Sequence, residues 1–186
     1  MIRKSGMYAD LECILLTEEE LKAGIRRLGE TITRDYAGKE PLLVCTLKGA
    51  VNFFADLIRE IDLPLAVDFI AASSYKGTES TGKVNIRKDV DADIAGRDVL
   101  IVEDIIDTGI TLNNLKTELL KRKPASLKIV TLLDKPGGRQ SDLEPDYACF
   151  TIPDGFVVGY GLDYNEKYRN LPDIGILARH IYEKEN

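Results

Sequence analysis

Blocks of apolar residues along this chain predict strands that are separated by helices. Residues 99–102 are four consecutive aliphatic residues, which suits a strand covered on both faces in a parallel sheet. Further core strands are expected over residues 42–47, 65–72, 127–133 and 147–152. The pattern therefore favours an α/β fold, with a central parallel sheet flanked by helices.

Apolar residues at helical spacing predict the intervening helices. Thr17 and Glu20 form a capping box, so a helix is expected to begin after Thr17 and to end near Gly38. Helices are also expected over residues 50–61 and 112–120, whereas residues 174–182 fit either a strand or a helix. These helices alternate with the strands, as parallel connections require.

The polar residues after the central strand form the candidate site. Glu103 and Asp104 are expected at the strand's end, and a turn leading into the next helix follows, made of Asp107, Thr108, Gly109, Ile110 and Thr111. Open α/β sheets bind their ligands at this carboxyl edge.

The residue types in this segment fit a phosphorylated sugar. Helix N-terminal N–H groups, with the hydroxyls of Thr108 and Thr111, suit one phosphate monoester. Ionised Glu103 and Asp104 only accept hydrogen bonds, so they suit vicinal sugar hydroxyls or the water shell of Mg²⁺. Asp107 lies between sugar and phosphate, where a base is able to act. Taken singly, each residue fits an ordinary strand end or helix cap equally well.

Residues 73–83 are a long polar stretch that contains glycine. A loop between two antiparallel strands is the simplest account of it. The residues alone favour an ordinary surface hairpin tip over a functional loop.

Composition places the chain among globular proteins with one domain, residues 1–186. Hydrophobic residues make up 44% and charged residues 30%, and the net charge of -6 implies no broad basic face for nucleic acid. Cys13, Cys45 and Cys149 lack metal-binding or redox spacing, which favours reduced thiols, and His180 is expected to be a surface or packing residue. The polar N-terminus and the short apolar runs predict a cytoplasmic protein with no membrane association.

The whole string from the strand to Thr111 closely resembles the phosphoribosyl pyrophosphate (PRPP) signature of the type I phosphoribosyltransferases. Spacing alone indicates a phosphate and polyol site, and the resemblance supplies the ligand's name. It implies the type I fold, with a small hood formed by the N-terminal segment and residues 153–186. It also matches Ser74 and Tyr75 to a flexible loop that closes over the active site and keeps water away.

Further segments resemble the 6-oxopurine branch of that family, the hypoxanthine-guanine phosphoribosyltransferases. The resemblance implies a pyrophosphate site at Lys48, Gly49 and Arg169, with a cis peptide bond before Lys48. It also implies a base site, made of Lys135 on the purine's exocyclic oxygen, Phe156 stacked on the ring, and Val157 and Asp163 at its edge. Asp163 matches a ligand of a second Mg²⁺, so the implied metal residues are Glu103, Asp104 and Asp163.

The implied activity is Mg²⁺-dependent purine salvage. PRPP and hypoxanthine or guanine would give IMP or GMP and pyrophosphate, with Asp107 as the catalytic residue and a homodimer or homotetramer as the assembly. Two alternatives stay open, namely transfer to another base and a regulator that only binds PRPP. A regulator would be free to lose Asp107 or Lys135 and usually has a basic face.

Overall fold

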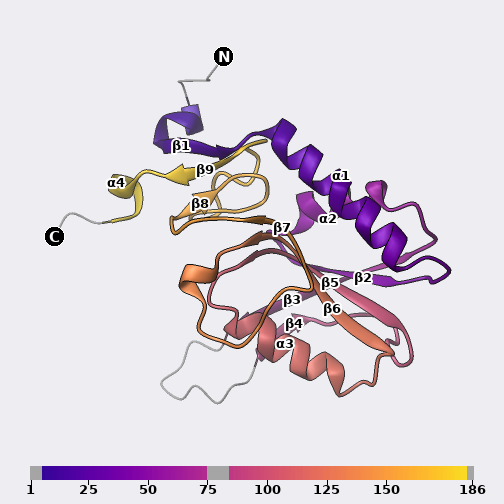
Figure 1. The fold of residues 1–186 in the computed structure, drawn as a ribbon. Coiled ribbons are helices and arrows are strands. Elements are labelled where there is room, and N and C mark those ends of the chain that lie inside the picture. Colours follow the sequence, from indigo (N-terminus) through magenta and orange to yellow (C-terminus); the bar gives the residue numbers. More distant parts are fainter. Residues whose placement is uncertain (1–5, 75–83, 184–186) are drawn as a thin grey trace.

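The computed structural model describes residues 6–74 and 84–183, and its centre is a six-stranded sheet (Figure 1). The strands follow the order β4-β3-β2-β5-β6-β7, and all run parallel except β4, which pairs antiparallel with β3. Their bounds are β2 (Leu42–Thr46), β3 (Ala66–Ser74), β4 (Val84–Lys88), β5 (Asp98–Ile106), β6 (Ser126–Asp134) and β7 (Tyr147–Thr151). The predicted α/β fold is confirmed.

Helices cover both faces of this sheet (Figure 1). On one face, α1 (Glu18–Asp35) and α2 (Val51–Glu60) bury apolar side chains against the strands, and on the other face α3 (Ile110–Leu120) does the same. Because both faces are covered, β2 is buried along its whole length, as its continuous apolar sequence predicts.

The first long helix begins as the capping box predicts. The Thr17 hydroxyl accepts a hydrogen bond from the Glu20 N–H at 3.3 Å, and the Glu20 carboxylate accepts one from the Thr17 N–H at 2.8 Å. The helix ends at Asp35, near the predicted end at Gly38, and Gly38 lies in the turn that follows with φ +78°.

Two boundaries around the candidate site differ from the prediction. Glu103 and Asp104 lie inside β5 rather than at its end, because pairing with β6 continues to Ile106 and Asp134. The helix after the turn begins at Ile110, so Ile110 and Thr111 belong to its first turn.

A second, three-stranded antiparallel sheet lies at the carboxyl edge of the first (Figure 1). Its order is β1-β9-β8, with β1 (Leu11–Leu16), β8 (Val157–Val158) and β9 (Ile174–Leu177). Residues 174–182 contain both expected elements, since β9 is followed by α4 (Arg179–Tyr182). The short 3₁₀ helices are η1 (Gly6–Asp10) and η2 (Pro136–Gly138). Within the described residues, none of the helices combines the length and the apolar character that a membrane span needs.

Candidate active site

Glu103, the first of the two acidic residues of β5, faces the end of the neighbouring strand β2. The Thr46 hydroxyl donates a 2.8 Å hydrogen bond to the Glu103 carboxylate, and the Asp104 N–H donates to the same oxygen at 3.1 Å. Burial, and next the charge of Asp104, raise the pKa of Glu103 well above its ordinary value. A ligand that supplies positive charge or hydrogen-bond donors would stabilise the ionised form of Glu103.

The predicted phosphate cradle is the N-terminus of α3. Gly109 is the N-cap with φ +73°, and a Cβ there would lie 2.5 Å from Ser141 Oγ, so this position favours glycine. The Thr108 hydroxyl lies 3.5 Å from the Ile110 N–H, and Thr111 sits in the first turn. First-turn N–H groups have no partner within their helix, so the geometry suits an anion.

Arg139 and Gln140 hold the turn before α3 in place through hydrogen bonds to its carbonyl groups. The Arg139 Nε donates to the Asp107 carbonyl at 3.0 Å, and the Gln140 N–H donates to the Thr108 carbonyl at 2.9 Å. The Arg139 side chain is 10% exposed, and its guanidinium also pairs with Asp134, the residue before Lys135. Arg139 therefore links the turn to the segment that carries Lys135, the residue expected to contact the base.

Asp107 and Lys135 form an ion pair at the carboxyl edge. The Lys135 Nζ lies 3.0 Å from the Asp107 Oδ2, with the side chains 15% and 46% exposed respectively. Gly138 makes room for the carboxylate, since a Cβ there would lie 1.8 Å from Asp107 Oδ1. The sequence predicted both residues as functional but not this contact between them.

A cavity of about 280 Å³ opens beside this ion pair. It is lined by residues that the sequence analysis assigned to the site, namely Asp104, Asp107, Lys135, Phe156, Val157 and Asp163. Ile105, Gly155 and Leu162 complete the lining. One cavity therefore joins the predicted base site to the predicted PRPP segment.

Phe156 stands at this cavity with 38% of its surface exposed, which excludes an ordinary core role. Its ring stacks on that of Tyr182 with centroids 5.1 Å apart, and it meets the edge of Tyr164 at 5.5 Å. The ring is thus held by its neighbours, and an aromatic ring at a cavity wall suits a flat, conjugated ligand.

The loop after β2 packs directly against Asp104. The Leu47–Lys48 peptide is cis, as the resemblance implied. A Cβ on Gly49 would lie 1.5 Å from Asp104 Oδ2, and one on Gly161 would lie 2.1 Å from the Gly49 carbonyl oxygen. These close approaches bring the predicted pyrophosphate loop to the acidic pair and to the segment after β8.

Arg169 and Lys48, the two cations assigned to pyrophosphate, both contact carboxylates of the loop 163–169. The Arg169 Nη2 lies 2.7 Å from Asp163 Oδ1, and the Arg169 Nη1 donates to the Gly161 carbonyl at 2.7 Å. The Lys48 Nζ lies 3.1 Å from Glu166 Oε2, which is 3.4 Å from Arg169 Nη2. The structure thus brings the two cations to a shared carboxylate.

The acidic residues fit Mg²⁺ only in combination with a substrate. Among residues 6–74 and 84–183, no group of three or more acidic, histidine or cysteine side chains could hold a metal ion. Mg²⁺ is commonly bound by one or two carboxylates together with substrate phosphates and waters. The oxygens of Glu103, Asp104 and Asp163 suit that arrangement.

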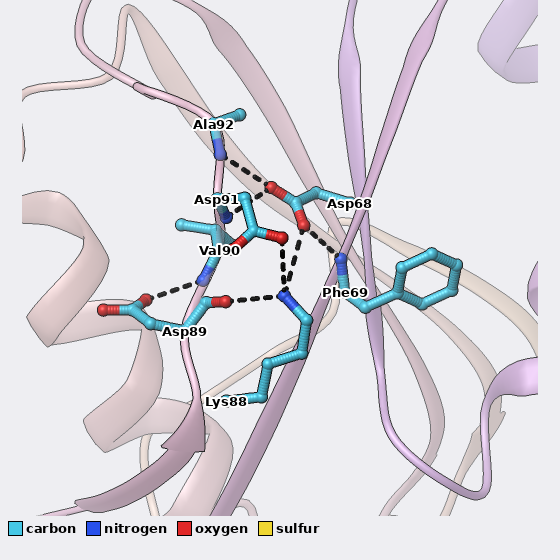
Figure 2. Close-up of polar contacts among 7 residues, drawn as sticks. All are labelled: Asp68, Phe69, Lys88, Asp89, Val90, Asp91 and Ala92. Atoms are coloured by element: carbon cyan, nitrogen blue, oxygen red, sulfur yellow. Dashed lines mark hydrogen bonds and ion pairs between the residues drawn. The ribbon is translucent and has the colours of Figure 1, made fainter.

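The antiparallel strands β3 and β4 lie on either side of the predicted flexible loop in the sequence. Asp68 of β3 binds the segment that follows β4 (Figure 2). Its buried carboxylate accepts hydrogen bonds from the N–H groups of Phe69, Asp91 and Ala92 and lies 3.7 Å from Lys88 Nζ. Burial alone would raise the pKa of Asp68, but these donors and Lys88 lower it below its usual value. Of the predicted loop residues, the backbone of Ser74 ends β3, whereas its side chain and Tyr75 lie outside the described residues.

Sequence reasoning missed three residues that bear on the site. Arg139 and Glu166 resemble ordinary surface charges in sequence, and Tyr182 lies in a segment without a diagnostic motif. The buried state of Arg139 is set by contacts across the fold. The Gly-Gly pair before it was the available local signal, because glycines mark close approach.

Comparisons with known proteins show which proteins this chain is similar to. A sequence profile of the phosphoribosyl transferase domain matches residues 14–165. A hypoxanthine-guanine phosphoribosyltransferase of Streptococcus thermophilus is 54% identical over 176 residues, or 94% of this chain and 98% of the relative. One from Lactococcus lactis subsp. lactis is 54% identical over 175 residues, or 94% and 95%. A solved hypoxanthine phosphoribosyltransferase of Staphylococcus aureus is similar at TM-score 0.94 and 51% identity, covering 98% of this chain and 100% of that one.

Proposed function

The chain belongs to the hypoxanthine-guanine phosphoribosyltransferase family, and from that premise we propose its substrates and the roles of its residues. It is a transferase of purine salvage. We propose that it moves the 5-phosphoribosyl group of PRPP to N9 of hypoxanthine or guanine in the presence of Mg²⁺, giving IMP or GMP and pyrophosphate.

The observation that carries the proposal is the Asp107–Lys135 ion pair between the cavity and the α3 N-terminus. It presents an ammonium group and a carboxylate to one flat ligand. Lys135 has three donors and no acceptor, so it pairs with a 6-oxygen and meets only another donor at a 6-amino group. The base is therefore a 6-oxopurine, stacked on Phe156, with the main chain at Val157 along its edge.

Asp107 is the residue that interacts with the ring proton of the purine during the reaction. Its carboxylate is 46% exposed at the cavity and pairs with Lys135, and the glycine at 138 leaves room for it. As the ribose bond to N9 forms, the purine ring becomes more acidic, and Asp107 accepts its proton or stabilises the charged ring. Lys135 remains bound to the exocyclic oxygen and offsets the negative charge there.

The phosphoribosyl group lies along β5 and the start of α3. The α3 N-terminus with Thr108, Gly109, Ile110 and Thr111 binds the 5-phosphate, while Glu103 and Asp104 accept hydrogen bonds from the ribose hydroxyls. Mg²⁺, when bound near Glu103, Asp104 and Asp163, supplies charge neutralisation to the pyrophosphate group. Much of the rate comes from holding the anomeric carbon and N9 in line.

The leaving group is bound by the loop at Lys48 and Gly49 together with Arg169. Negative charge builds on pyrophosphate as its bond to the anomeric carbon stretches, and the positive charges of Lys48 and Arg169 stabilise it. Gly49 suits this position because its lack of a side chain lets the loop approach Asp104.

Product identification tests the proposal. Purified protein is incubated with PRPP, Mg²⁺ and either hypoxanthine or guanine, and the products are separated by chromatography with and without a chelator. We expect IMP or GMP and an equal amount of pyrophosphate, with formation lost in chelator and regained on addition of Mg²⁺. Binding of PRPP without any nucleotide formed would favour a PRPP-sensing module instead.

A further inference from the structure

Glu166 contacts both cations of the proposed pyrophosphate site. We infer that its carboxylate is an internal competitor of pyrophosphate, which the ligand must displace in order to bind and which favours its release after reaction. The inference rests on the proposed function, because that function assigns Lys48 and Arg169 to the leaving group.

The first observation is the geometry of the contacts. Glu166 Oε2 lies 3.1 Å from Lys48 Nζ and 3.4 Å from Arg169 Nη2, so one carboxylate oxygen is shared by the two cations. Pyrophosphate oxygens need the same donors.

The second observation is the backbone that presents Glu166. The N–H groups of Tyr164 and Lys167 each donate to the other's carbonyl, and the residues between them, Asn165 and Glu166, have φ +50° and +61°. This is the pattern of a type I′ turn, whose central positions favour glycine, asparagine or aspartate. The turn conformation therefore does not explain why this position is glutamate, whereas the contacts of the glutamate side chain do.

The third observation is that the two cations differ in how they are held. Arg169 has two partners besides Glu166, because its Nη2 lies 2.7 Å from Asp163 Oδ1 and its Nη1 donates to the Gly161 carbonyl at 2.7 Å. In the described part of the chain, the carboxylate of Glu166 is the partner found for the Lys48 ammonium. Removing Glu166 should therefore free Lys48 while Arg169 stays in place.

The expected size of the effect follows from exposure. The side chains of Lys48 and Glu166 are each 66% exposed, and such an ion pair shifts an equilibrium by at most about fivefold. A ligand that needs the unpaired lysine loses affinity by the same factor. Competition by Glu166 should thus weaken pyrophosphate binding by about two- to fivefold.

The test is a double-mutant cycle on pyrophosphate affinity, measured by calorimetry at fixed Mg²⁺ concentration. We expect Glu166→Gln to bind pyrophosphate about two- to fivefold more tightly, and to be inhibited more strongly by it during turnover. Glu118→Gln is the matched control, because Glu118 forms an exposed pair with Lys121 far along α3, and it should bind as the unaltered protein does. In a Lys48→Met background the gain from Glu166→Gln should shrink, because only the contact of Glu166 with Arg169 then remains.

The outcomes separate the two claims. If Lys48→Met weakens binding but Glu166→Gln leaves it unchanged or weaker, competition is overturned and the pyrophosphate site stands. A gain of undiminished size in the Lys48→Met background, or one that Glu118→Gln reproduces, also overturns competition, since it reflects overall charge. If Lys48→Met binds pyrophosphate normally, Lys48 is not a pyrophosphate residue and the proposed site fails together with the inference.

Discussion

Gly138→Ala tests whether the position of the Asp107 carboxylate sets the rate. The added Cβ would lie 1.8 Å from Asp107 Oδ1, whereas ordinary contacts begin near 3.4 Å. The carboxylate must therefore move by about 1.6 Å, away from the place where Lys135 holds it at 3.0 Å. Displacements of about 1 Å at a reacting group cost about 10²-fold in rate, so we expect turnover to fall by about that factor.

The fold should tolerate this substitution. Gly138 does not have a positive φ, and Asp107 is half-exposed, so its side chain can turn toward solvent. Replacing glycine by alanine where the backbone allows it stabilises a protein by about 0.4–1 kcal/mol, which offsets loss of the ion pair. The melting temperature should therefore change little while turnover falls.

Gly137→Ala is the matched control for this prediction. Its Cβ would lie 2.6 Å from Asp154 Oδ1, so it also displaces a carboxylate, but that carboxylate is exposed and outside the proposed site. Steady-state turnover with hypoxanthine and saturating PRPP is measured for both variants beside thermal unfolding. Near-normal turnover in Gly138→Ala would show that the Asp107 carboxylate does not need this position, and the proposed role would fail.

Two further variants test the acidic residues. Asp107→Asn should keep PRPP binding, because Thr108, Thr111 and the α3 N-terminus remain, but should lose about 10²- to 10⁴-fold in turnover, and near-normal turnover would place the base elsewhere. Glu103→Gln should flatten the pH dependence of stability. Because the raised pKa makes the folded state bind a proton more tightly than the unfolded state, stability falls as pH rises above the ordinary value of 4.5. Melting temperatures between about pH 5 and pH 8 should drop more in the unaltered protein, and equal slopes would contradict this.

Local sequence signals were enough for most of the fold. The capping box at Thr17 and the continuous apolar run of β2 depend on neighbouring residues, so their elements were predicted. The end of β5 was not, because its extension through Glu103 depends on pairing with β6, a strand distant in sequence. Polar residues inside a strand look like a strand end when the partner strand is unknown.

In the site as well, single residues could be predicted from local sequence, but contacts between distant residues could not. Asp107 and Lys135 were each predicted, but their 3.0 Å contact arises from the register of β5 and β6, which the sequence does not display. Arg139 and Glu166 were missed because a charge in sequence carries no sign of burial or partner. Their roles depend on carbonyls and cations that the fold brings together.

Base choice tests the central claim most directly, because it depends on Lys135 reading a 6-oxygen. The measurement compares kcat/KM for hypoxanthine and adenine at saturating PRPP and Mg²⁺. At adenine the Lys135 ammonium would face an amino group, and sites that hydrogen-bond a specific polar group reject such analogues by about 10⁴-fold or more. We expect hypoxanthine and guanine to react and adenine to fall at least that far below them. Adenine within about tenfold of hypoxanthine would contradict the assignment of Lys135 and the function built on it.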